Sequence, residues 1–165
     1  MIKKINYFFQ AFLIYLFFFI GRISGIKLSR KIFSFLFSLI GPFFKSTKVV
    51  NNNLKILSEN NIIFNKKKII TDMWNNYGMT FIEYVFLDKL RKDDSFIKIE
   101  GEDNLSQLIN KNKPVIFVSG HFANFELMSM QITKMKINLA TIYRPLNNIF
   151  LNPLMEHLRR KYVCK

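Results

Sequence analysis

Apolar residues dominate two blocks near the start of the chain. The first runs from Ile5 to Ile20 (INYFFQAFLIYLFFFI) and the second from Ile32 to Phe44. As a helix, the first block would extend about 24 Å, which approaches the roughly 30 Å hydrocarbon core of a bilayer. The second block is too short to span and is closed by Gly41-Pro42, a helix-breaking pair. The pattern predicts a membrane helix followed by an interfacial or membrane-packed helix.

A secretory signal peptide is an alternative for the first block, because Lys3 and Lys4 precede an apolar run. Against this alternative, no A-x-A-like cleavage site follows, and the second apolar block continues the membrane-seeking pattern. A single cysteine, Cys164, excludes a disulfide framework and agrees with a reducing compartment. We therefore expect the first block to remain as an anchor.

Basic residues flank both apolar blocks, and no acidic residue precedes Glu59. More basic residues follow the first block than precede it, which predicts that the bulk of the chain is cytoplasmic. They are Arg22, Lys27, Arg30 and Lys31, against Lys3 and Lys4. The formal net charge of +14 favours anionic membrane lipids over nucleic acid as a partner, because the basic residues cluster around lipid-like segments. An AT-biased genome, which enriches Lys, Asn, Ile and Phe, is the alternative origin of this charge.

Helical periodicity continues beyond the two blocks. Apolar side chains recur at spacings near three and four over residues 66–90, which predicts an amphipathic helix with Gly78 as its weak point. Residues 45–57 form a polar, basic junction that could also be helical. We expect two parts: residues 1–44 as membrane anchor and interfacial helix, and residues 45–165 as a cytoplasmic α/β domain.

Strand and helix patterns alternate in the second half of the chain. Strands are expected at residues 96–100 (FIKIE), 115–118 (VIFV) and 137–142. Helices are expected at residues 103–110 with Asp103 as the cap, at about 124–135 and at about 150–161. This alternation predicts an α/β fold with a mainly parallel sheet and flanking helices, in which ligands bind beyond the carboxyl ends of the strands.

His121 and Glu126 follow the VIFV segment and are candidates for acid-base chemistry. On one continuous helix, residues five apart would point about 140° away from each other. If His121 instead lies on the turn after Gly120 and Glu126 on the first helical turn, the carboxylate can hold one imidazole nitrogen and leave the other basic. The alternative is a histidine that caps a helix beside a solvated glutamate.

The two most specific segments of the chain are VIFVSGHFANFELMSMQI, with its H-x4-E box, and ATIYRPLNNIFLNPLMEHLRRK, with YRP-x-NN. They resemble the lipid A biosynthesis acyltransferases, the late lauroyl and myristoyl transferases of Gram-negative inner membranes. Glycerol-phosphate acyltransferases share the box more loosely, as H-x4-D. The anchor, the NNNLKIL junction and the stretch around Trp74, Tyr77 and Gly78 also match. The resemblance therefore covers nearly the whole chain and implies a glycerol-phosphate-acyltransferase-like fold.

This resemblance implies roles for particular residues. His121 would take the proton from an acceptor hydroxyl that attacks the thioester of an acyl carrier protein, and Glu126 would orient the imidazole. Arg144 would bind acceptor phosphate or support the developing charge; an ordinary surface arginine in a turn is its alternative. Asn147 and Asn148, which belong to the same YRP-x-NN segment, would bind substrate.

Arg159 would touch the acidic carrier protein or lipid head groups, although a solvated helix end explains it equally well. The basic residues at 22–31 and 45–55 would bind the phosphates of a lipid A precursor. His157 is assigned to a helix surface and Cys164 to no role. The reaction needs no metal and no cofactor beyond the acyl carrier protein donor.

Family members are usually about twice this length, so we expect the chain to be an N-terminal fragment with an incomplete sheet. The expected location is the bacterial inner membrane, with the catalytic part facing the cytoplasm. Two alternatives remain. One is an acyltransferase for another glycolipid or phospholipid acceptor. The other is a basic membrane-anchored binding protein, or an inactive membrane-anchored fragment, in which the H-x4-E box is only structural.

Overall fold

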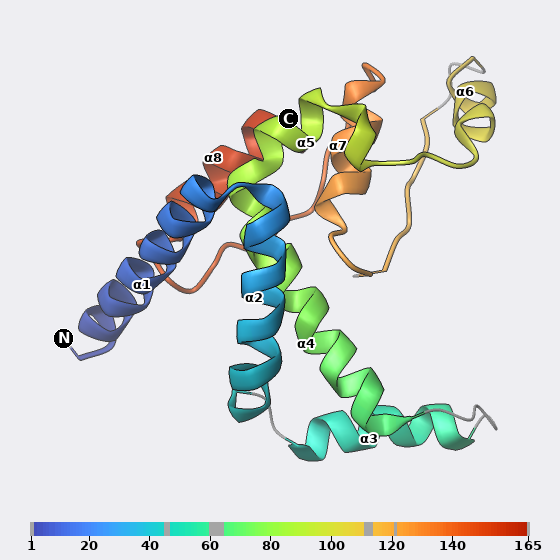
Figure 1. The fold of residues 1–165 in the computed structure, drawn as a ribbon. Helices are drawn as coiled ribbons and strands as arrows, with labels where there is room; N and C mark the ends of the chain where they lie inside the picture. Colours follow the sequence, from blue (N-terminus) through green and yellow to red (C-terminus); the bar gives the residue numbers. More distant parts are fainter. Residues whose placement is uncertain (1, 45–46, 60–64, 111–113, 121, 165) are drawn as a thin grey trace. The chain divides into compact units, whose positions relative to one another are not determined.

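Figure 1 shows the fold in the computed structural model, which describes residues 2–44, 47–59, 65–110, 114–120 and 122–164. Two compact units follow from the contacts within the chain. Unit 1 comprises residues 1–86 and 146–153, and unit 2 comprises residues 87–145 and 154–165. Each unit is considered by itself. The expected division at residue 44 concerns membrane association, which these contacts do not test, so it stays a prediction.

The expected α/β fold with a parallel sheet is wrong. Within the described ranges the secondary structure is helical, and no strand is present. A β-sheet requires backbone hydrogen bonds between neighbouring strands, and residues 115–118 and 137–142 form no such ladder. Ile116, Val118 and Ile142 remain exposed as a result. The apolar runs were correctly identified, but a run of this kind does not show whether a partner strand exists.

Unit 1 contains the first six helical elements, and the helices expected there are confirmed. They are α1 (Ile2–Ser24), α2 (Ile26–Ile40), η1 (Gly41–Phe43), α3 (Thr47–Glu59), α4 (Lys66–Glu83) and η2 (Tyr84–Phe86). Gly25 separates α1 from α2 with a φ of 73°, a conformation that glycine adopts without strain. The helix expected over residues 66–90 starts as predicted but changes to a 3-10 turn after Glu83.

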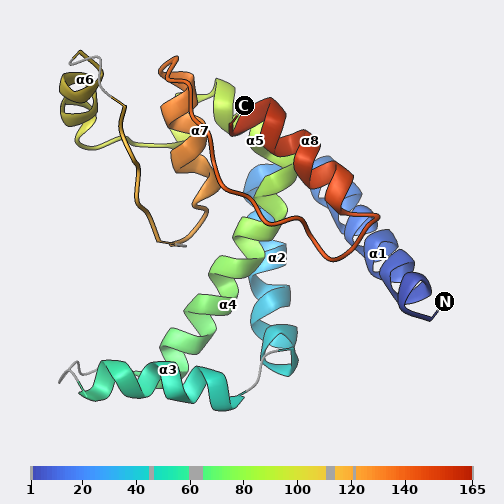
Figure 2. The ribbon, with the colours of Figure 1, turned by 180° about the vertical axis from the view of Figure 1, so that it is seen from behind.

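Helices α2 and α4 pack closely against each other in antiparallel directions (Figure 1, Figure 2). At their crossing, a Cβ atom on Gly78 would lie 2.1 Å from the carbonyl oxygen of Phe33. Nearer the end of α2, a Cβ atom on Gly41 would lie 2.1 Å from the ring of Trp74. Gly78 is therefore a site of close backbone approach and not a weak point of α4, because only a residue without a side chain fits there.

Two arginines of the basic segment 22–31 bond to other parts of unit 1. Arg30 donates to Oε1 of Glu83 through Nε at 2.7 Å, and its Nη2 lies 2.6 Å from the same oxygen. Arg22 donates through Nη1 to the carbonyl of Val85 at 2.7 Å and lies over the ring of Phe86. These arginines thus join the α1–α2 pair to α4 and η2.

Unit 2 contains α5 (Leu87–Lys92), η3 (Asp94–Phe96), α6 (Glu102–Asn110), α7 (Glu126–Lys134) and most of α8 (Asn152–Tyr162). The three helices expected in this half are confirmed. The expected cap at Asp103 is wrong, because α6 already starts at Glu102 and Asp103 lies within its first turn. Buried apolar side chains form the core of this unit: Leu87, Leu90, Met130, Ile132 and Val163.

Arg91 of α5 forms hydrogen bonds to both α7 and α8 within unit 2. Its Nη1 donates to the carbonyls of Met130 at 3.1 Å and Tyr162 at 2.8 Å, and to the hydroxyl of Thr133 at 2.9 Å. A cation at the carboxyl ends of helices is favourable, because unpaired carbonyls carry partial negative charge there. The ends of both helices are held by this one side chain.

Helix α1 is long and apolar enough to cross a membrane, by length and composition alone. A signal sequence near the N-terminus or the core helix of a soluble protein would meet the same criterion. Most large apolar side chains of α1 are exposed within the chain, which distinguishes it from a buried core helix.

Candidate active site

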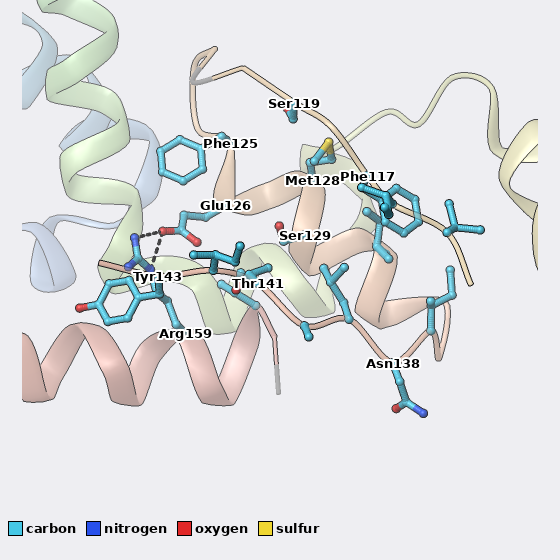
Figure 3. Close-up of a pocket in the computed structure, with 18 of the residues that line it drawn as sticks. Phe117, Ser119, Phe125, Glu126, Met128, Ser129, Asn138, Thr141, Tyr143 and Arg159 are labelled. Carbon is cyan, nitrogen blue, oxygen red and sulfur yellow. Dashed lines mark hydrogen bonds and ion pairs between the residues drawn. The ribbon is translucent and has the colours of Figure 1, made fainter. Parts of the chain in front are cut away.

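A cavity of about 1050 Å³ lies within unit 2 (Figure 3). One wall is formed by α7, and the others by the two extended segments that contain expected strands, residues 114–120 and 137–144. Arg159 and Val163 of the C-terminal part close it. The cavity therefore lies beside the segments that sequence analysis singled out for chemistry.

Glu126 is the first residue of α7, the position on the first helical turn where the sequence placed it. It is only 4% exposed, and its Oε1 accepts hydrogen bonds from Nε of Arg159 at 2.8 Å and from Nη2 at 2.6 Å. A carboxylate this deeply buried requires a compensating cation, which Arg159 supplies. Figure 3 shows both bonds and the two side chains pointing toward each other.

Tyr143 completes this cluster. The guanidinium carbon of Arg159 lies 4.3 Å from the centre of the Tyr143 ring, a cation-π distance. Arg159 is thus held between a carboxylate on one helix and an aromatic ring on an extended segment, which fixes its orientation more firmly than either contact alone. A guanidinium with a fixed orientation can stabilise negative charge without reorganising.

His121 lies outside the described residues, so its proposed hydrogen bond with Glu126 stays a prediction. Its neighbours are described. The N-H of Phe122 donates to the carbonyl of Gly120 at 2.9 Å, and Ala123 has a φ of 45°. A positive φ is uncommon for alanine and marks a backbone that the surroundings hold in place.

The other expected site residues fall into two groups. Arg144 is exposed and lines the same cavity as Glu126 and Arg159. Asn147 and Asn148 belong to unit 1, where Asn147 is exposed and Asn148 is buried. The structure therefore brings Glu126, Arg144 and Arg159 to one cavity and assigns the asparagines to the other unit.

Asn148 makes contacts that hold its loop against α1. Its Nδ2 donates to the carbonyl of Tyr7 at 2.9 Å, and its Oδ1 accepts from the N-H of Phe150 at 3.0 Å. The hydroxyl of Tyr15 donates to the carbonyl of Phe150 at 2.9 Å. These bonds explain the burial of Asn148 by a role within the protein, and substrate binding by Asn148 and Asn147 stays a prediction.

Sequence reasoning missed the pairing of Glu126 with Arg159 and the stacking of Arg159 on Tyr143. One signal was present: an acidic residue on an otherwise apolar helix start calls for a nearby cation. The sequence offers Arg159, Arg160 and Lys161 for this purpose without distinguishing them. His157 lies exposed on α8, as expected, and Cys164 accepts a hydrogen bond from the hydroxyl of Thr141 at 3.1 Å.

In the part of the chain that the structure describes, no group of three or more His, Cys, Asp or Glu side chains could hold a metal ion. His121 lies outside the described residues, so this absence does not extend to it. A reaction without a metal or cofactor stays a prediction.

Comparison with known proteins adds to this geometry. No curated protein and no solved structure matches the chain. A family model described as bacterial lipid A biosynthesis acyltransferase matches residues 2–164. The resemblance seen in the H-x4-E box and the YRP-x-NN segment is confirmed by this match, which leaves out only the first and last residues. The chain belongs to the bacterial lipid A biosynthesis acyltransferase family.

Proposed function

We propose that this acyltransferase moves a fatty acyl chain from acyl carrier protein to a hydroxyl group of a lipid A precursor. The observation that carries the proposal is the buried Glu126, held by Arg159 at the start of α7, five residues after His121 and on the wall of a cavity. Membership of the family supplies the reaction class and the type of acceptor. The donor and the particular precursor are part of the proposal.

The proposed chemistry is a single acyl transfer. His121 removes the proton from the acceptor hydroxyl as its oxygen attacks the thioester carbonyl carbon. The new C-O bond forms, the C-S bond breaks, and the protonated imidazole returns its proton to the leaving thiolate. The acceptor becomes an ester and the carrier protein leaves with a free thiol.

Glu126 orients the imidazole of His121 and balances the positive charge that forms on it. Arg159 positions the Glu126 carboxylate through two hydrogen bonds to one oxygen. Because the carboxylate is buried, its interaction with a charged imidazole is weakened little by solvent. Arg159 thus acts through Glu126 and is a positioning residue in this scheme.

Arg144 is proposed to bind a phosphate group of the acceptor. It is exposed at the cavity, and a guanidinium suits phosphate oxygens because it presents two parallel donors. Asn147, also exposed, is a further candidate for contact with the acceptor. The proposed location is the bacterial inner membrane, with α1 as the anchor and the cavity on the cytoplasmic side, where acyl carrier protein is available.

The test is product analysis in membranes that contain the full 165-residue chain. Acyl carrier protein loaded with a labelled acyl chain is supplied with a tetra-acylated lipid A precursor, and separate reactions offer a phospholipid acceptor or acyl-CoA as the donor. The proposal predicts label in the lipid A precursor, dependent on the carrier protein and missing from membranes without the chain. Label in the phospholipid alone would identify another acceptor, and no transfer in any reaction would reject an active enzyme.

A further inference from the structure

The outer side of α2 carries a row of exposed apolar side chains. Residues three and four apart share a helix face, and this row falls within about 60° of arc. Its members, here called the outer row, are Leu28, Ile32, Phe35 and Leu39. The opposite side of α2 is buried in unit 1 through Ile26, Ser29 and Phe33. One apolar side of the helix is therefore covered by protein, while the outer row is exposed.

Two aromatic side chains extend the outer row beyond the end of α2. Phe43 is 89% exposed and Phe44 is 81% exposed. They follow Gly41, which packs under the Trp74 ring so closely that no side chain would fit. The end of α2 is thus fixed by a tight contact, and the two large apolar side chains that follow it are exposed. Exposed apolar groups gathered in this way mark an interaction surface.

Position and charge identify a membrane surface as the partner. Only Gly25 separates α2 from α1, the candidate membrane-spanning helix, so the outer row starts where that helix ends. Lys27 and Lys31 are exposed on α2 and lie roughly 70° to 110° around the helix from the centre of the outer row. Basic side chains beside an apolar face are typical of helices that lie in the head-group region of an anionic bilayer.

The packing of α2 excludes a deep position in the bilayer. Its inner side contacts α4 along much of its length, and Arg30 of α2 is paired with Glu83 of α4. Helix α4 exposes Lys68 and Asp72, which would be costly to bury in hydrocarbon. Since α2 cannot enter the membrane without α4, only its outer row and the Phe43-Phe44 tip can reach the acyl chains.

We infer that the outer row of α2 and the Phe43-Phe44 tip form a second membrane contact, which inserts into the bilayer interface while α4 stays outside the hydrocarbon. This inference rests on the membrane location in the proposed function and adds the contact surface and its depth. It does not depend on which acyl donor or acceptor the enzyme uses.

The test measures the depth of single positions in the full chain. Cys164→Ser removes the native thiol, and Phe43→Cys then carries an NBD fluorophore. The matched control is Asp72→Cys, an exposed position about 120° around α4 from its contact residue Gly78. Both proteins are placed in vesicles of phosphatidylethanolamine and phosphatidylglycerol that contain lipids spin-labelled at the head group or along the acyl chain.

The inference predicts that NBD at position 43 shifts its emission to shorter wavelength and loses most of its intensity to spin labels near the head groups and the upper acyl chain. Position 72 should keep a water-like emission. Equal, water-like emission at both positions would overturn the inference, as would quenching of position 43 only by labels at the bilayer centre. Trp74 emission that is unchanged from the parent protein, measured before NBD is attached, verifies that α2 and α4 remain packed in both variants, and the acyl transfer assay reports separately on the proposed function.

Discussion

Each unit of the molecule contains one buried glutamate held by an arginine, and the two pairs have nearly the same geometry. In unit 1, Arg30 contacts Oε1 of Glu83 at 2.7 and 2.6 Å. In unit 2, Arg159 contacts Oε1 of Glu126 at 2.8 and 2.6 Å. The two glutamates are similarly buried, at 5% and 4% exposure.

The surroundings of the two pairs differ. Glu83 lies where α2 and α4 pack tightly, whereas Glu126 starts a helix at the wall of a cavity, five residues after His121. Ion-pair geometry alone therefore does not identify a catalytic carboxylate. Glu126 differs from Glu83 by the cavity, the helix start and a histidine five positions earlier in the sequence, and the following variants test whether that difference is catalytic.

The largest effect on stability is expected from Arg159→Met. Glu126 would then remain buried without its cation, and removing one partner of a buried pair costs about 3 kcal/mol. Arg30→Met should cost less, about 2 kcal/mol, because the Arg30 side chain is 30% exposed against 20% for Arg159. Denaturant unfolding in detergent, followed by circular dichroism, measures both. Adding Glu126→Gln to Arg159→Met should recover part of the lost stability. A further loss of equal size would contradict the role of Arg159 as the cation that compensates buried Glu126.

Turnover should separate the two glutamates. Glu126→Gln is expected to lower the rate about a hundredfold, because a neutral amide cannot balance the charge on the catalytic imidazole. Glu83→Gln removes the same charge from the pair in unit 1 and should leave turnover per folded molecule unchanged. Acyl transfer rates divided by the folded fraction give the comparison. Equal losses of turnover in both variants would contradict a catalytic role that belongs to Glu126 and not to Glu83.

The close crossing in unit 1 should be sensitive to a single methyl group. Gly78→Ala is expected to destabilise by about 2 kcal/mol, because the new Cβ meets the backbone of Phe33. Helix propensity alone would predict a gain of about 1 kcal/mol, so the sign of the change is decisive. Gly21→Ala is the control and should destabilise less than Gly78→Ala, since its Cβ meets the Ile82 side chain and not backbone. Unfolding monitored by Trp74 fluorescence measures both, and a stabilised Gly78 variant would refute the close crossing.

The smallest effect is expected on the surface of α4. Lys68 and Asp72 are paired at 2.7 Å but are 72% and 56% exposed. Solvent screens such a pair, so Lys68→Ala should change stability by about 0.4 kcal/mol at most. The same unfolding measurement at low and high salt should show little difference for this variant. A loss comparable to that of Arg30→Met would mean that exposure does not set the size of these effects.

Helices could be predicted from the sequence because their signal is local. The apolar spacing around Trp74 and the first block located α4 and α1 without knowledge of any partner. The sheet could not be predicted in the same way, because VIFV and residues 137–142 have the composition of strands but no described strand pairs with them. The meaning of Gly78 also depended on a neighbouring helix that the sequence does not identify.

The candidate site shows the same division between local and distant information. Glu126 could be placed at a helix start from the residues around it, and this is where it lies. Its partner Arg159 is 33 residues away in the sequence, and Tyr143 reaches Arg159 from a different segment. No spacing rule connects three segments of this kind, so the cluster became visible only in the folded chain.

We propose His121 as the general base of this acyltransferase, and the chain provides its own control because it has only two histidines. The most direct measurement compares His121→Ala with His157→Ala in acyl transfer from acyl carrier protein to a lipid A precursor, at equal amounts of folded protein. We expect a loss of at least about a hundredfold for His121→Ala and an unchanged rate for His157→Ala. An unchanged rate for His121→Ala in an active enzyme would contradict it.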